Sequence, residues 1–198
     1  MDKLLNNIKF EKKYVLFSLI IVILGIITGS LFITILDSSD KNLVIEYVSS
    51  FIENLDNNIL LNTLICNVLT ISIIIIIGFT FFLFPINIII LFYKAFIIGF
   101  TLSSFILIYR LKGILISIIY IFPHMIINIL VFSLLTAFTT KISLIVIKYI
   151  IKRKELNMRV YFNKYISIVF FSVLIIILTS LYESYVMIYL LKFVRCIL

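Results

Sequence analysis

The chain has 198 residues, of which 64% are hydrophobic and 13% are charged, and its mean hydropathy is +1.29. Soluble domains are about 45–50% apolar and about 25% charged, and one globule of this size cannot bury so much apolar surface. The composition therefore excludes a soluble enzyme, a disordered chain and a secreted disulfide scaffold. The net charge of +8 comes from basic residues that gather beside apolar runs, which indicates membrane topology and no nucleic-acid binding.

Five segments are long and apolar enough to cross roughly 30 Å of hydrocarbon as helices. They cover residues 14–36, 59–82, 86–109, 113–138 and 165–185. The first is too long for the apolar region of a signal peptide and has no A-x-A cleavage site, so we expect an uncleaved anchor. Pro85 predicts the turn between the second and third segments. The sequence thus predicts an all-α, multi-pass fold in which residues 1–198 form a single integral membrane domain.

Two basic clusters determine the expected orientation. Four basic residues precede the first span, and seven lie in the loop 141–164. Lys and Arg favour the cytoplasmic side, and these two clusters share that side if the chain crosses the membrane five times. We therefore expect the N-terminus inside and the C-terminus outside.

The loop after the first span is acidic and is predicted to lie outside. Apolar residues recur in it at helical spacing, at Val44, Val48, Phe51 and Leu55, and Asp40 is a suitable N-cap. We expect an amphipathic helix over residues 43–56 on the membrane surface. One interpretation is a lid over the ends of the spans. The other is a docking surface for an extracytoplasmic partner, with Glu46, Phe51 and Glu53 as its candidate residues.

The basic inner loop 141–164 is predicted to begin as a helical extension of the fourth span. Lys148, Lys152, Glu155 and Arg159 follow one another at helical spacing. Such a helix would lie against anionic membrane lipid, at about 1 kcal/mol for each basic residue near the surface. The alternative is that the cluster serves only as a topology anchor.

Four polar residues lie at similar depths inside the predicted spans. At a rise of about 1.5 Å per residue, Lys94, His124, Asn128 and Asn67 lie roughly 12, 15, 9 and 18 Å from the inner face. Glu183 is expected near the outer interface, and Lys94 can instead extend toward the inner interface. The four residues are predicted to form a buried polar cluster. They either hold the helices together or line a transport or proton pathway.

Small residues in two spans predict close helix packing, and Pro123 predicts a break in the fourth span. Gly25 and Gly29 lie four residues apart in the first span, and Gly99 and Ser103 repeat that spacing in the third.

Motifs for catalysis and for cofactor or metal binding are missing from the sequence. It contains no GxSxG, HExxH or Walker A pattern and no pair of acidic residues within one span. One histidine and two widely separated cysteines do not form a zinc motif. We therefore expect no enzymatic activity, no cofactor and no metal site.

Three segments carry a family resemblance: LFYKAFIIGFTLSSF (91–105), LKGILISIIYIFPHMIIN (111–128) and LTSLYESYV (178–186). Together they resemble the stage II sporulation protein M family of integral membrane proteins. The residues in the family's motif positions are Lys94, Gly99, Phe100, Thr101, Gly113, Pro123, His124, Asn128, Glu183 and Tyr185. Ala95 stands where the family usually has glycine.

The resemblance implies a non-enzymatic scaffold in the bacterial cell membrane. Such a scaffold positions two extracytoplasmic peptidoglycan-degrading partners, stage II sporulation proteins D and P, during engulfment of the forespore. An alternative within the same broad family is a membrane component of circular-bacteriocin export or immunity beside a transporter ATPase, or another transporter subunit. In that case Lys94, His124 and Asn128 would line a translocation or docking surface.

Overall fold

The computed structural model describes residues 2–53, 59–79, 83–121, 124–152, 158–187 and 189, and these residues form helices and no strand. A chain in lipid must satisfy its backbone hydrogen bonds internally, and helices do so within a single segment. Within the described residues, four helical stretches are long and apolar enough to cross a membrane: Lys12–Ile35, Phe84–Ile119, Met125–Ile151 and Tyr165–Tyr182. The prediction of an all-α membrane protein is confirmed, while five spans and an inside N-terminus stay predictions.

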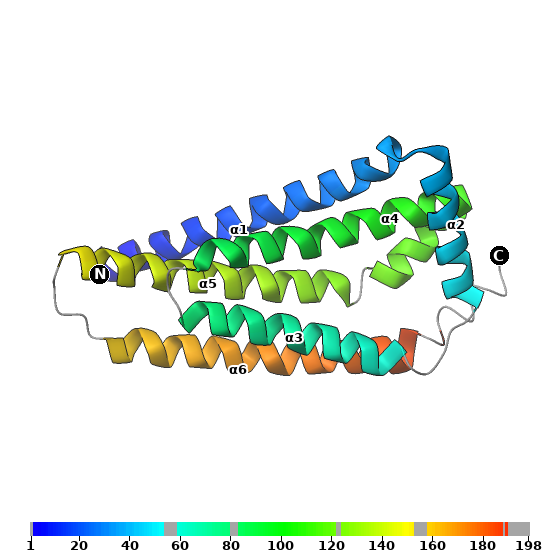
Figure 1. Ribbon diagram of the computed structural model, residues 1–198. Helices are drawn as coiled ribbons and strands as arrows, with labels where there is room; N and C mark the ends of the chain where they lie inside the picture. Colours follow the sequence, from blue (N-terminus) through cyan, green and yellow to red (C-terminus); the bar gives the residue numbers. More distant parts are fainter. Residues whose placement is uncertain are drawn as a thin grey trace.

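Five helices run along a common axis, and one lies across the end of the bundle (Figure 1). The lengthwise helices are α1 (Asp2–Ile35), α3 (Ile59–Phe79), α4 (Phe84–Ile121), α5 (Met125–Lys152) and α6 (Met158–Tyr182). The crossing helix is α2 (Ser38–Glu53), and a π-helical turn, Glu183–Met187, follows α6. We call the end that carries α2 the α2 end, and the end where α1 begins the N-terminal end.

α1 and α4 cross at small residues, which we call the glycine seam: Gly25, Gly29, Ala95 and Gly99. A Cβ atom added to Gly29 would lie 2.1 Å from the carbonyl oxygen of Phe96, and one added to Gly99 would lie 2.1 Å from that of Ile26. The two backbones therefore touch, as small residues permit in membrane helices. Ala95 accompanies Gly99 at this crossing, because its Cβ faces Gly25.

α4 contains a sharp reversal where a loop between two spans was expected. Arg110 has φ 50° and ψ −122°, a conformation that is costly for any residue with a side chain. Gly113 follows, where an added Cβ would lie 2.1 Å from the carbonyl oxygen of Phe105, so the returning chain packs directly on the incoming helix. The predicted fourth span, 113–138, is divided further along, because α4 ends at Ile121 and α5 begins at Met125.

α2 begins before the predicted N-cap. The backbone N–H of Lys41 donates to the carbonyl oxygen of Asp37 at 3.0 Å, and the helix starts at Ser38. Asp40 therefore lies in the first turn and is not the N-cap. Asp37 takes that place, and Asp40 still stabilises the helix because a carboxylate near a helix N-terminus interacts favourably with its dipole.

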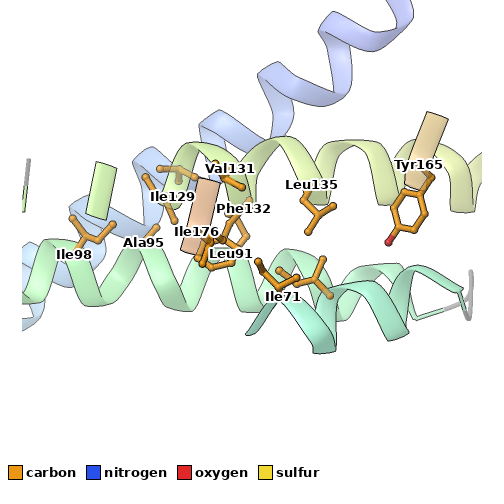
Figure 2. Packing of buried hydrophobic residues seen from close by; sticks show 12 residues of the cluster. Ile71, Leu91, Ala95, Ile98, Ile129, Val131, Phe132, Leu135, Tyr165 and Ile176 are labelled. Carbon is orange, nitrogen blue, oxygen red and sulfur yellow. The ribbon is translucent and has the colours of Figure 1, made fainter. Parts of the chain in front are cut away.

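Apolar side chains from the lengthwise helices fill the middle of the bundle. Figure 2 shows Leu91, Ala95 and Ile98 of α4 facing a row of α5 side chains that includes Ile129, Phe132 and Leu135. Ile71 of α3 and Ile176 of α6 join the same cluster. This apolar core lies beside the polar cavity described next, because Phe132, Ile98 and Ile129 belong to both.

Candidate functional site

A partly open cavity of about 110 Å³ lies within the helix bundle. Its polar lining comes from several helices and consists of Asn67, Lys94, His124, Asn128 and Glu183. Its apolar lining consists of Ile97, Ile98, Met125, Ile129 and Phe132. Ionisable side chains are rare inside membrane helices, and their presence there marks a functional site by default.

His124 occupies the N-cap position of α5. Its carbonyl oxygen accepts a hydrogen bond from the backbone N–H of Asn128 at 2.9 Å, and its side chain is only 1% exposed. The imidazole Nε2 lies 3.5 Å from Oε1 of Glu183. The carboxylate therefore lies beside the N-terminus of a 28-residue helix, where the helix dipole favours negative charge.

Glu183 continues the buried face of α6. Ser172, Ile176 and Thr179 precede it at helical spacing, and all three are buried, as is Glu183 at 6% exposure. Glu183 is also the first residue of the π-helical turn. Such turns interrupt α-helices at functional sites more often than elsewhere. This one places a carboxylate beside the N-terminal end of α5.

Hydrogen bonds between side chains join the helices around the cavity. The Thr179 hydroxyl of α6 donates to Oδ1 of Asn128 on α5 at 2.5 Å. The Asn67 amide of α3 donates to the Ser180 hydroxyl of α6 at 3.5 Å. We call these four residues, together with His124 and Glu183, the polar seam. Polar side chains that bond across helices are a main source of helix association in lipid.

Lys94 reaches the cavity from α4. Its Nζ lies 5.7 Å from the centroid of the Phe132 ring, within the range of a cation–π contact. Lys94 thus places a positive charge in the same cavity as the Glu183 carboxyl group.

The structure brings the four residues of the predicted cluster, Asn67, Lys94, His124 and Asn128, to one cavity. It also brings Glu183 there, so the expectation that Glu183 lies apart from these four residues is wrong, while its position near the outer interface stays a prediction. The depth estimate ended the fourth span at residue 138, whereas α5 runs on to Lys152. At about 1.5 Å per residue, the 28 residues of α5 place His124 about 42 Å from the far end of that helix, level with Glu183.

Thr179 and Ser180 were not among the predicted site residues. The spacing of polar residues in the sequence could have indicated this face of the helix. Polar residues recur on one face of an apolar helix at Ser172, Thr179 and Glu183. A search for polar residues at helical spacing would have linked Glu183 to the interior.

The residues in the family's motif positions serve several parts of the fold. Gly99 lies in the glycine seam, and the ring of Phe100 stacks on that of Phe96 with centroids 6.4 Å apart. Thr101 lines a second cavity, of about 220 Å³, between α4 and α2. Gly113 lies at the reversal in α4, and Tyr185 is 62% exposed. Pro123 lies outside the described residues.

The candidate docking residues lie on α2, where Glu46 is exposed. The side chains of Phe51 and Glu53 lie outside the described residues. Val44 and Val48, from the predicted apolar face, are half-buried and line the second cavity with α4. Leu43 and Tyr47, which were not predicted as docking residues, are 63% and 74% exposed.

The fold and the cavity define a helical membrane protein with ionisable and amide groups gathered in its interior. Within the described ranges, no group of three or more His, Cys, Asp and Glu residues is placed to hold a metal ion. Comparison with known families matches residues 18–187 to stage II sporulation protein M, and the chain belongs to this family. The predicted resemblance is thereby confirmed. Comparisons with curated proteins and with solved structures give no match.

Proposed function

We propose that this membrane protein of the sporulation family is a non-enzymatic scaffold that recruits peptidoglycan-degrading partners during engulfment of the forespore. The partners implied by the family resemblance are the extracytoplasmic stage II sporulation proteins D and P. They carry out hydrolysis, and the present chain places them at the septum.

The observation that carries this proposal is the two-sided character of α2. Val44 and Val48 hold the helix against α4, and Leu43 and Glu46 are exposed. Tyr47 borders the cavity between the two helices but is still 74% exposed. An aromatic and an aliphatic side chain beside a carboxylate are suited to binding another protein, since aromatic residues are enriched at interfaces.

The charge of this segment supports a basic partner surface. The predicted outer loop has five acidic residues against one basic residue: Asp37, Asp40, Glu46, Glu53, Asp56 and Lys41. Complementary charge mainly raises the association rate and the specificity of docking. A basic segment on the partner, with an apolar side chain to cover Leu43 and Tyr47, would match the exposed side of α2.

The proposal is tested with the double variant Glu46→Lys/Tyr47→Ala and the exposed control Asn42→Gln. In sporulating cells, a fluorescent fusion of the double variant is expected to lose co-purification of proteins D and P and to leave engulfment incomplete. Asn42→Gln should behave as wild type. Normal engulfment after deletion of the whole protein, or unchanged recovery of both partners with the double variant, would refute the scaffold role.

A second candidate function is a membrane component of bacteriocin export or immunity beside a transporter ATPase. The observation that favours it is the cavity with Lys94, His124 and Glu183, since a scaffold does not require ionisable groups in the bundle interior. This function predicts that Lys94→Ala abolishes secretion or immunity while the protein still inserts in the membrane. A producer strain with this variant and a normal titre would exclude it.

A further inference from the structure

The size of the polar cavity limits what it can hold. Sites for small organic molecules usually have volumes of about 300–1,000 Å³. The cavity here has about 110 Å³, which is space for several water molecules. Its polar lining offers these waters hydrogen-bond partners from Asn67 and Asn128 as well as from the ionisable groups.

The charges around the cavity limit its contents further. The Lys94 ammonium and the Glu183 carboxylate have opposite signs, so the lining with a neutral imidazole has no net charge to attract a metal ion. A proton can change the charge of this site without occupying volume. Water and protons are therefore the contents that agree with both the volume and the charge.

The geometry brings a proton donor and a proton acceptor together. Nε2 of His124 lies 3.5 Å from Oε1 of Glu183, which is within reach of one bridging water or a small side-chain adjustment. Both side chains are more than nine-tenths buried, so they reach bulk solvent only through the cavity.

We propose that the cavity is a hydrated proton-exchange site in which Glu183 and His124 share one proton and the Lys94 ammonium lies close enough to influence it. When the proton leaves the carboxylic acid for Nε2, the products are a carboxylate and an imidazolium, and no other bond changes. With the Lys94 ammonium beside it, the pair gives the site one net positive charge while it holds this proton, and no net charge after the proton is lost to solvent. This role goes beyond the scaffold function and does not depend on it.

Among the described residues that line the cavity, Lys94 is the further charged group that faces this pair. Lys94 comes from α4, and the Cys66 thiol of α3 is close enough to Lys94 to interact electrostatically. The remaining lining residues are amides and apolar side chains, and none comes from α1 or α2. The Glu183 carboxylate should therefore favour protonation of His124, and the Lys94 ammonium should oppose it.

The chain contains a single histidine, which makes the test direct. In the full-length protein labelled with ¹⁵N-histidine and placed in lipid bilayers, the imidazole nitrogen resonances report the protonation of His124 alone. We expect them to change with bulk pH. At a fixed pH, Glu183→Gln should lower the ratio of imidazolium to imidazole by about tenfold or more, because it removes the stabilising negative charge. Lys94→Met should raise the same ratio.

The exposed α4 variant Lys112→Met is the matched control for Lys94→Met and should leave the ratio unchanged. If Glu183→Gln lowers the imidazolium ratio and Lys94→Met raises it, the proton is shared as proposed. A general disturbance of the fold would change the ratio in the same direction in both variants. Imidazole resonances that do not respond to pH while the helices persist would overturn the proposal. Equal or same-sign responses to Glu183→Gln and Lys94→Met would also overturn it.

Discussion

The glycine seam and the polar seam hold the same bundle together by different means. In the glycine seam, α1 and α4 meet backbone to backbone at Gly25, Gly29 and Gly99. In the polar seam, α3, α5 and α6 are joined by side-chain hydrogen bonds and by the His124–Glu183 pair. Lipid is as apolar as leucine, so apolar side chains alone give membrane helices little reason to associate. Close backbone contact and buried hydrogen bonds both favour the association of membrane helices, and this chain has both.

The two seams differ in whether a change in protonation can alter their contacts. Backbone packing at Gly29 depends only on shape, and no change in protonation alters it. The contact of His124 with Glu183 depends on which group carries a proton. We therefore expect the packing of α1 against α4 to be independent of pH. The contacts of the polar seam are expected to change with the protonation of His124 and Glu183.

The largest expected effect is in the glycine seam. Gly29→Leu places a Cβ atom where the Phe96 carbonyl oxygen lies, so the two helices must separate. We expect a loss of about 3 kcal/mol or more in the free energy of unfolding, measured by reversible unfolding in bicelles. The neighbouring Thr28 is exposed, and Thr28→Leu should cost less than about 0.5 kcal/mol. Equal losses for the two variants would contradict the backbone contact.

A smaller effect is expected from the shorter hydrogen bond of the polar seam. Thr179→Val keeps the shape of the side chain and removes the 2.5 Å bond to Asn128. Bonds of this kind in membrane proteins are worth about 0.6–1.7 kcal/mol, and the same unfolding measurement should show a loss in that range. Thr179→Ser retains the hydroxyl group and serves as the control. If it loses as much stability as the valine variant, the bond does not hold α5 to α6.

The smallest effect is expected from Ser180→Ala. The bond from Asn67 to Ser180 is 3.5 Å long, at the limit of a hydrogen bond, and should contribute less than about 0.6 kcal/mol. Unfolding of the single variants and of the Thr179→Val/Ser180→Ala double variant would rank the two bonds. A greater loss for Ser180→Ala than for Thr179→Val would reverse the order that the distances imply.

The features that could be predicted from the sequence are those that depend on local spacing. Gly25 and Gly29 lie four residues apart on one helix, and their role in packing follows from that spacing. His124 and Asn128 lie one helical turn apart, so both reach the same cavity. The grouping of these two with Lys94 and Asn67 also followed from depth, because all four lie well inside apolar runs.

The features that could not be predicted depend on tertiary structure. The turn at residues 110–112 was expected from the gap between the predicted spans 86–109 and 113–138, but the positive φ of Arg110 was not, because that residue is not glycine. The length of α5 determined the level of His124, and an estimate that ended the span at residue 138 placed Glu183 too far away. The partner of Gly99 in the glycine seam depends on how α1 and α4 cross, which neither helix specifies alone.

The meeting of the start of α5 with the end of α6 is the central claim, and cross-linking tests it most directly. In a chain with Cys66→Ser and Cys196→Ser, the pair His124→Cys and Glu183→Cys should be joined rapidly in native membranes by a short bifunctional thiol reagent. The pair His124→Cys and Tyr185→Cys should react slowly, because Tyr185 is exposed on another side of the turn. Rapid cross-linking of the Glu183 pair alone is the predicted result. No cross-linking of that pair, or equal rates for the two pairs, would contradict the account.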